Sequence, residues 1–193
     1  IAGGALTVAL LDAISGTVST ATVDSSSTFR YATATLVDGL PVIAYTDEDG
    51  GSERIAHCKA WPCNDASLFE LATIDHIGKF PSSCGSGVTF CPYGVFPQIR
   101  SFPMPHGLNS ANGVLVYYNA TSPRAGALKM ALCSSPSCQT ARVQVLASAP
   151  IDGFGRDASI SISAQHQLVY VSFLNYGNSD RNMTLGLVVA SFQ

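Results

Sequence analysis

Charged residues are scarce in this chain of 193 residues. Asp, Glu, Lys and Arg make up 12% of the chain and apolar residues 47%, so the charged share is about half of that usual in a soluble domain. Only ten residues are Lys or Arg, and they form no cluster. Binding to a nucleic acid backbone needs cationic side chains that neutralise phosphates, so nucleic acid is not expected as a partner.

Long hydrophobic runs are also missing. No apolar stretch approaches the roughly 20 residues that a membrane-spanning helix requires, which predicts no membrane insertion. No segment has a helical period either, because apolar residues alternate or form short runs bounded by Gly, Pro, Asn and Asp. The sequence therefore predicts an all-β protein that covers its apolar surface with partners, with sugars or with copies of itself.

Patterns of catalytic residues are absent from the sequence. It contains no G-x-S-x-G motif, its thirteen acidic residues suggest no facing pair, and its histidines show no metal-ligand spacing. The loop Asp47-Glu48-Asp49-Gly50 is similar to a calcium loop but lacks a downstream bidentate Glu, which favours a β-turn. We therefore predict no enzyme activity, no catalytic residue, no metal site and no cofactor.

Six cysteines form three close pairs: Cys58 with Cys63, Cys84 with Cys91, and Cys133 with Cys138. The first and third pairs share the spacing C-x4-C after an apolar run, which predicts disulfides across hairpin ends in a secreted, extracellular protein. A zinc site with four of these thiols is the alternative. It is disfavoured because the two pairs recur at the same place in a repeated unit. The middle pair predicts a rigid inserted loop, either for binding or for stability alone.

Two N-glycosylation motifs are present, at Asn119 and Asn182, each beside a predicted strand end. Together with the paired cysteines they favour a eukaryotic secretory route. N-linked glycans are therefore expected on both residues.

A repeated pattern organises the chain. An apolar strand at 40–45 recurs at 113–118 and 167–173, with Tyr45, Tyr118 and Phe173 aligned. A second run follows each copy, at 54–58, 129–133 and 188–192, and recurs once more at 7–11. The unit is a four-stranded hairpin array, with strands a to d. It predicts one β-repeat domain over 1–193, made of a partial unit 1–28, a unit 29–75, an insertion 76–94, a unit 95–152 and a partial unit 153–193.

The stretch Asp38-Gly39-Leu40-Pro41-Val42-Ile43-Ala44-Tyr45-Thr46-Asp47, with its glycine turn and x-A-x-C hairpin end, resembles the blades of secreted β-propeller repeat proteins. The resemblance implies repeated four-stranded antiparallel modules in a propeller-like, disulfide-stapled fold. It implies no activity, because lectins, enzymes and scaffolds share such blades. An ordinary β-sandwich is the alternative fold.

The ends of the pattern carry the functional prediction. Strand c occurs at both ends, so the chain is either part of a longer propeller or is completed by other copies. We expect Leu6, Val8 and Leu10 to lie on a segment that pairs with a sheet edge of another copy, with these side chains in its pockets. The chain is thus predicted to be a structural or interaction protein of an extracellular glycosylated assembly or filament.

Two other functions stay open at this point. A lectin-like module is the first, although the single Trp61 sits in a hairpin tip whose counterpart has no aromatic residue, and a packing role for it is the simpler interpretation. The second is an enzyme domain whose catalytic residues lie in loops that show no motif.

Overall fold

The computed structural model describes residues 4–76, 97–103, 111–122, 125–149, 154–176 and 183–191. Within these ranges it contains thirteen β-strands, one short 3-10 helix and no α-helix. The all-β prediction is therefore confirmed. Within the same ranges, no helix is long and apolar enough to cross a membrane.

The strands form four antiparallel sheets, here named A to D, and each sheet comes from one consecutive part of the chain. Sheet A pairs β1 (Leu6–Leu11) with β2 (Val18–Asp24). Sheet B has the order β3 (Phe29–Val37), β4 (Leu40–Asp47), β5 (Ser52–Cys58) and β6 (Phe69–His76), with the 3-10 helix η1 (Ala66–Leu68) before β6.

Sheets C and D repeat this hairpin order. Sheet C contains β7 (Gln98–Pro103), β8 (Ala111–Ser122), β9 (Ala125–Cys133) and β10 (Ala141–Ala149). Sheet D contains β11 (Phe154–Ser163), β12 (Leu168–Tyr176) and β13 (Met183–Ser191), and in the described residues it has no fourth strand.

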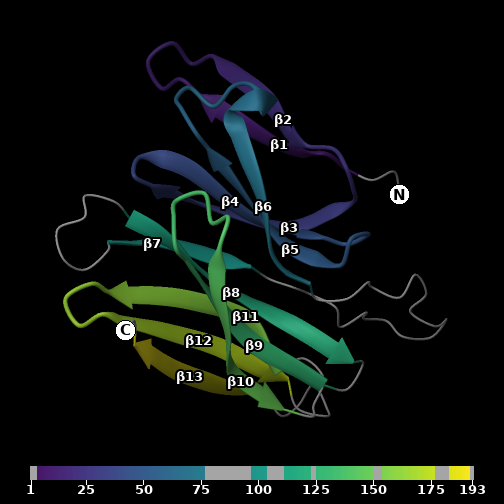
Figure 1. The fold of residues 1–193 in the computed structure, drawn as a ribbon, viewed down its shortest axis with the longest axis vertical. Coiled ribbons are helices and arrows are strands. Elements are labelled where there is room, and N and C mark those ends of the chain that lie inside the picture. Colours follow the sequence, from purple (N-terminus) through teal and green to yellow (C-terminus); the bar gives the residue numbers. More distant parts are fainter. Residues whose placement is uncertain are drawn as a thin grey trace.

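The sheets stack face to face in sequence order, from A at the top of Figure 1 to D at the bottom. One apolar cluster lies between each neighbouring pair of sheets. Tyr45 belongs to the cluster between A and B, Leu115 to the one between B and C, and Val171 to the one between C and D. The alternation of side chains along a strand explains this arrangement, since a sheet covered on both faces needs apolar residues on both.

The first hairpin of the repeat has the same local geometry in sheets B and D. Strand β3 has a bulge at Tyr31 and strand β11 has one at Asp157, both with positive φ, six residues before the strand ends. The two-residue turn Asp38-Gly39 has positive φ at both residues, as a type I′ turn requires, which accounts for its Gly. Sheets B and D therefore begin with the same bulged hairpin.

The pairing of strands corrects one detail of the sequence alignment. Tyr45 lies opposite Arg54, Tyr117 opposite Lys129, and Phe173 opposite Gly186. All three aromatic side chains point toward the preceding sheet. The residue equivalent to Tyr45 is therefore Tyr117, and the predicted equivalence of Tyr118 is wrong by one position, which places a side chain on the opposite face of the sheet.

The stack is not a closed ring. Sheets A and D lie at its two ends, and Figure 1 shows them on opposite sides of the molecule. Sheets B and C are thus four-stranded antiparallel modules with one disulfide each, whereas the structure does not show the closure that defines a propeller.

Candidate functional site

Two hairpin tips carry disulfides, which confirms the pairs Cys58–Cys63 and Cys133–Cys138. Each disulfide joins the last residue of strand c, which is β5 in sheet B and β9 in sheet C, to the loop that leads to strand d. The zinc alternative is therefore wrong for these four cysteines. The third predicted pair, Cys84 with Cys91, lies outside the described residues.

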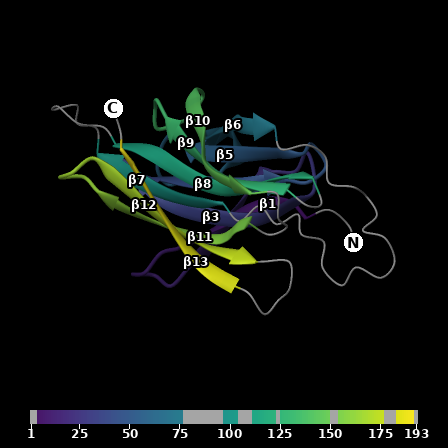
Figure 2. The same ribbon diagram turned by 90° about the horizontal axis from the view of Figure 1, so that it is seen from below.

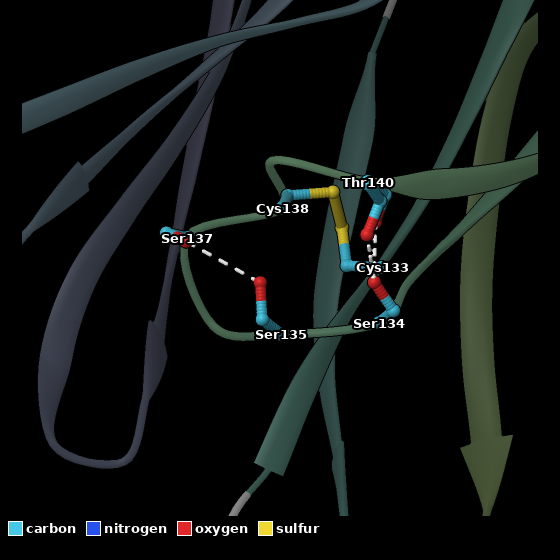
Figure 3. Close-up of a disulfide and its surroundings, with 6 residues drawn as sticks. All are labelled: Cys133, Ser134, Ser135, Ser137, Cys138 and Thr140. Carbon is cyan, nitrogen blue, oxygen red and sulfur yellow. Dashed lines mark hydrogen bonds between the residues drawn. A yellow bond between two sulfur atoms is a disulfide. The ribbon is translucent and has the colours of Figure 1, made fainter.

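The two tips share two backbone features. In each, the second cysteine has positive φ and donates its N–H to the carbonyl three residues earlier, in Ala60 or in Ser135. Figure 3 shows the second tip, where the Ser134 and Thr140 side chains also bond to each other beside the disulfide. Trp61 lies in the first tip with 65% of its surface exposed, and the tip of sheet C has no aromatic residue.

A polar contact joins sheet A to sheet B. The Tyr45 hydroxyl donates to Asp24 Oδ2 at 2.9 Å, and Arg54 Nη1 lies 2.8 Å from the same oxygen. Burial raises the pKa of Asp24, but the bonds from Ser26 and Tyr45 and the charge of Arg54 outweigh it and hold the pKa below its usual value. Asp24 is therefore an ionised, buried anchor between the two sheets.

The same contact recurs between sheets B and C. The Tyr117 hydroxyl donates to Asp75 Oδ2 at 2.7 Å, and Lys129 Nζ lies 2.7 Å from that oxygen. In both copies the Asp lies at the end of strand d, while the Tyr and the cation lie opposite each other on strands b and c of the next sheet. Each such contact thus joins one module to its successor.

The third interface lacks this contact. Between sheets C and D, Phe173 occupies the Tyr position and Gly186 the cation position. A Cβ on Gly186 would lie 2.2 Å from Phe173 Cζ, so the glycine makes room for the ring. The described part of this interface is an apolar cluster that includes Val169, Val171 and Phe173.

Glu53 is an unusual buried carboxyl between sheets B and C. Its side chain is fully buried, Oε1 accepts a bond from Thr46 Oγ1 at 2.8 Å, and Oε2 has no hydrogen-bond partner. Burial raises the pKa of Glu53 well above its usual value, and the negative charge of Asp75 adds to this. The environment therefore favours the protonated, neutral carboxyl.

The loop 47–50 forms the turn between β4 and β5. Asp47 accepts the N–H of Gly50, and the Asp47 carboxylate also lies 3.7 Å from Arg54 Nη1. These contacts match the predicted β-turn. Among the described residues, no group of three or more His, Cys, Asp or Glu side chains is placed to hold a metal ion.

The structure places the predicted self-association residues within this chain. Leu6, Val8 and Leu10 are partly buried against the cluster between sheets A and B. The backbone edge of β1 that faces away from β2 pairs with no strand among the described residues. Any association through β1 would therefore use its edge, whereas these three side chains belong to the chain's own core.

The structure describes one of the two predicted glycosylation sites. Asn119 lies inside β8 with only 4% of its surface exposed, so the expectation that it stands in a loop is wrong. Such burial leaves no room for a glycan in the folded protein. Asn182 lies outside the described residues.

Two apolar surfaces stand exposed on the stack. One is the outer face of β13, where Leu185, Leu187 and Val189 are 77%, 66% and 50% exposed. The other is the side of β3 that faces sheet A, where Leu36 is 58% exposed. Figure 2, seen from below, shows β13 in front of the other strands, with no described strand covering it.

Comparison of the chain with protein-family models, with curated proteins and with solved structures finds no match. The resemblance to propeller blades is thus not confirmed by a relative.

Sequence reasoning missed the contacts between modules. The signal was present, because a β-branched residue followed by Asp lies in the last three residues of strand d in sheets A and B, as Val23-Asp24 and Ile74-Asp75. It was missed because Asp24 and Tyr45 are 21 residues apart and belong to different repeat units.

Proposed function

We propose that this chain is a structural or interaction protein of an extracellular glycosylated assembly, and that its copies associate by strand pairing. The observation that carries the proposal is the edge of β1 that faces away from β2, with which no described strand pairs, although sheets B and C continue at this position. The outer edge of β13 is likewise unpaired among the described residues, at the position where β6 and β10 complete sheets B and C. Exposed strand edges are templates for pairing with another chain.

The chemistry of the chain supports the extracellular setting. Two disulfides are formed, and structural disulfides persist in oxidising compartments. The low charge of the chain fits a protein whose apolar surface is covered by partners and sugar. Because Asn119 is buried, we assign the glycan to Asn182.

The first test measures association and strand pairing together. Full-length protein made in a secretory host is examined by sedimentation velocity over a range of concentrations, and amide exchange of β1 is followed over the same range. We expect oligomers at high concentration and slower exchange of those β1 amides that point away from β2. A chain that stays monomeric, or oligomers in which β1 exchange is unchanged, would contradict strand pairing.

The second test concerns the glycan. We expect the secreted protein to lose mass on treatment with an N-glycosidase, and the Thr184→Ala variant to be made without that mass, because the acceptor motif is broken. The Thr121→Ala variant, which removes the motif of Asn119, is the matched control and should keep the full mass. Loss of the glycan in the control alone would reverse the assignment.

A further inference from the structure

The outer face of β13 has the character of a buried surface. Gly186 stands where sheet C has Lys129, so Leu185 and Leu187 correspond to Leu128 and Met130 of β9. In sheet C both of these positions are 0% exposed, because sheet D covers them. Sheet D therefore presents, uncovered, the face on which the next sheet of the stack would pack.

The exposed side of β3 is the second such surface. Counted from the bulges, its residues Ala32, Ala34 and Leu36 correspond to Ala158, Ile160 and Ile162 of β11. Those three residues of β11 pack beneath sheet C, whereas the three of β3 are exposed. The side of β3 that should be covered by a preceding sheet is thus open.

Sheet A explains why β3 is open. Sheet A has only two strands, and β2 contacts η1. The 3-10 helix η1 precedes β6, and β6 lies at the opposite edge of sheet B from β3. The unpaired edge of β1 therefore points toward the β3 side of the sheet. A strand added to this edge would lie over β3, at the usual spacing of about 4.8 Å between paired strands.

We propose that β13 of one copy pairs with the free edge of β1 in a second copy, and that the apolar outer face of β13 covers β3 of that second copy. This inference rests on the proposed function and names the two surfaces that meet. In this arrangement, sheet D of one copy extends sheet A of the second copy, and sheet B of the second copy covers the outer face of sheet D.

The chemistry of the two surfaces supports a second copy as the occupant. Leu185, Leu187 and Val189 carry no charge, and neither do the alanines and Leu36 on β3. Packing them together removes from water the three β13 side chains and Leu36, which are now half exposed or more. The contact is heterologous, so it leads to a ring or to a filament according to its rotation.

The test introduces single charges on each surface. Leu187→Asp and Leu36→Lys should each weaken self-association about tenfold or more, because an unpaired charge would be buried. An equal mixture of the two variants should associate more strongly than either alone, since the unchanged β13 of the Leu36→Lys copy can then meet the unchanged β3 of the Leu187→Asp copy. Val145→Asp is the control, because Val145 is 57% exposed on β10, away from both surfaces.

The outcomes separate this inference from the proposed function. If both charged variants associated as strongly as the wild type and their β1 amides were protected, the docking of β13 on β3 would be overturned while strand pairing stood. Association weakened equally by Val145→Asp would also overturn it, as would a mixture no stronger than the single variants. A wild-type chain that is monomeric at all concentrations would overturn both proposals, because no second copy would then cover β3 or β13.

Discussion

At the scale of single residues, the Asp–Tyr–cation contact joins sheet A to sheet B and sheet B to sheet C. Asp75 accepts from Tyr117 and pairs with Lys129 in a mostly buried setting, where hydrogen bonds to a charged group contribute about 1.5–3 kcal/mol each. The equivalent contact of Asp24 with Tyr45 has the same geometry. At these two interfaces the contact adds charged and polar atoms to the apolar cluster between the sheets.

Removal of the Tyr117 hydroxyl tests this contact. Tyr117→Phe should lower the free energy of unfolding by about 1–3 kcal/mol, because Asp75 loses a bond while its charge stays buried. Urea unfolding followed by far-ultraviolet circular dichroism measures the change. Tyr170→Phe, the same substitution at a partly exposed position of β12, should change it by less than about 0.5 kcal/mol. Equal effects of the two substitutions would show that the contact contributes nothing specific.

Glu53 predicts how stability depends on pH. Because its pKa is raised in the folded state, the folded chain binds this proton more tightly than the unfolded chain does. The contribution of Glu53 is therefore intact below the unfolded value of about 4.5 and declines as the pH rises toward the folded value, by up to about 1.4 kcal/mol for each pH unit.

The Glu53→Gln variant has no proton to lose at this position. Its free energy of unfolding should exceed that of the wild type by a margin that grows between pH 5 and pH 8, as measured by urea unfolding at each pH. Glu70→Gln, on the neighbouring strand β6, controls for the loss of one negative charge. A constant difference in free energy of unfolding across this range would contradict a raised pKa of Glu53.

At the scale of elements, the disulfide tips fix the ends of strands β5 and β9. Each closes a loop with a sequence separation of five, which in the chain-entropy model stabilises by about 2 kcal/mol. Cys138 has a φ of +54°, in the left-handed region that favours glycine. The tip therefore combines a cross-link with a backbone conformation that few residues adopt readily.

Two double variants separate these contributions. Cys133→Ala with Cys138→Gly should lower the free energy of unfolding by about 2 kcal/mol through loss of the cross-link. Cys133→Ala with Cys138→Ala should lower it by about 1 kcal/mol more, because alanine disfavours positive φ. Chemical unfolding monitored by circular dichroism gives both values. If the alanine variant were as stable as the glycine variant, the backbone of the tip would have rearranged.

Most strands and the two disulfide pairs could be predicted from sequence because they depend on local patterns. The alternation at 113–118 revealed β8, and C-x4-C after an apolar run revealed the tips. The position of Asn119 was not predictable in this way, since β8 extends to Ser122 through a polar segment and its pairing with β9 decides its length. The exposure of Leu36 and Leu187 was also not predictable, because the exposure of a strand residue depends on which sheet lies opposite.

At the scale of the whole molecule, each sheet contacts mainly its neighbours in sequence, as in repeat proteins whose stability is a sum of modules and interfaces. Sheet C has a neighbouring sheet on each face, and so has sheet B except over β3, whereas A and D each have a neighbour on one face. Local stability should therefore be highest in the middle of the stack.

Amide exchange of dilute protein tests this gradient. Peptides from β4 and β8 should exchange most slowly, and those from β1 and β13 most quickly, by about tenfold or more, because edge strands open without breaking the central interfaces. Mass spectrometry of peptides measures the order. Uniform exchange along the stack would show that the four sheets unfold as a single unit.

The division of the Asp–Tyr contact between consecutive modules has a consequence for how such a chain can grow. Residues 29–75 hold the Tyr45–Arg54 half of one contact and the Asp75 half of the next. A tandem duplication of this stretch would therefore bring Asp75 of the first copy to Tyr45 of the second, and each junction would arise complete. Whole modules can thus be gained or lost in a gene without the invention of a new interface.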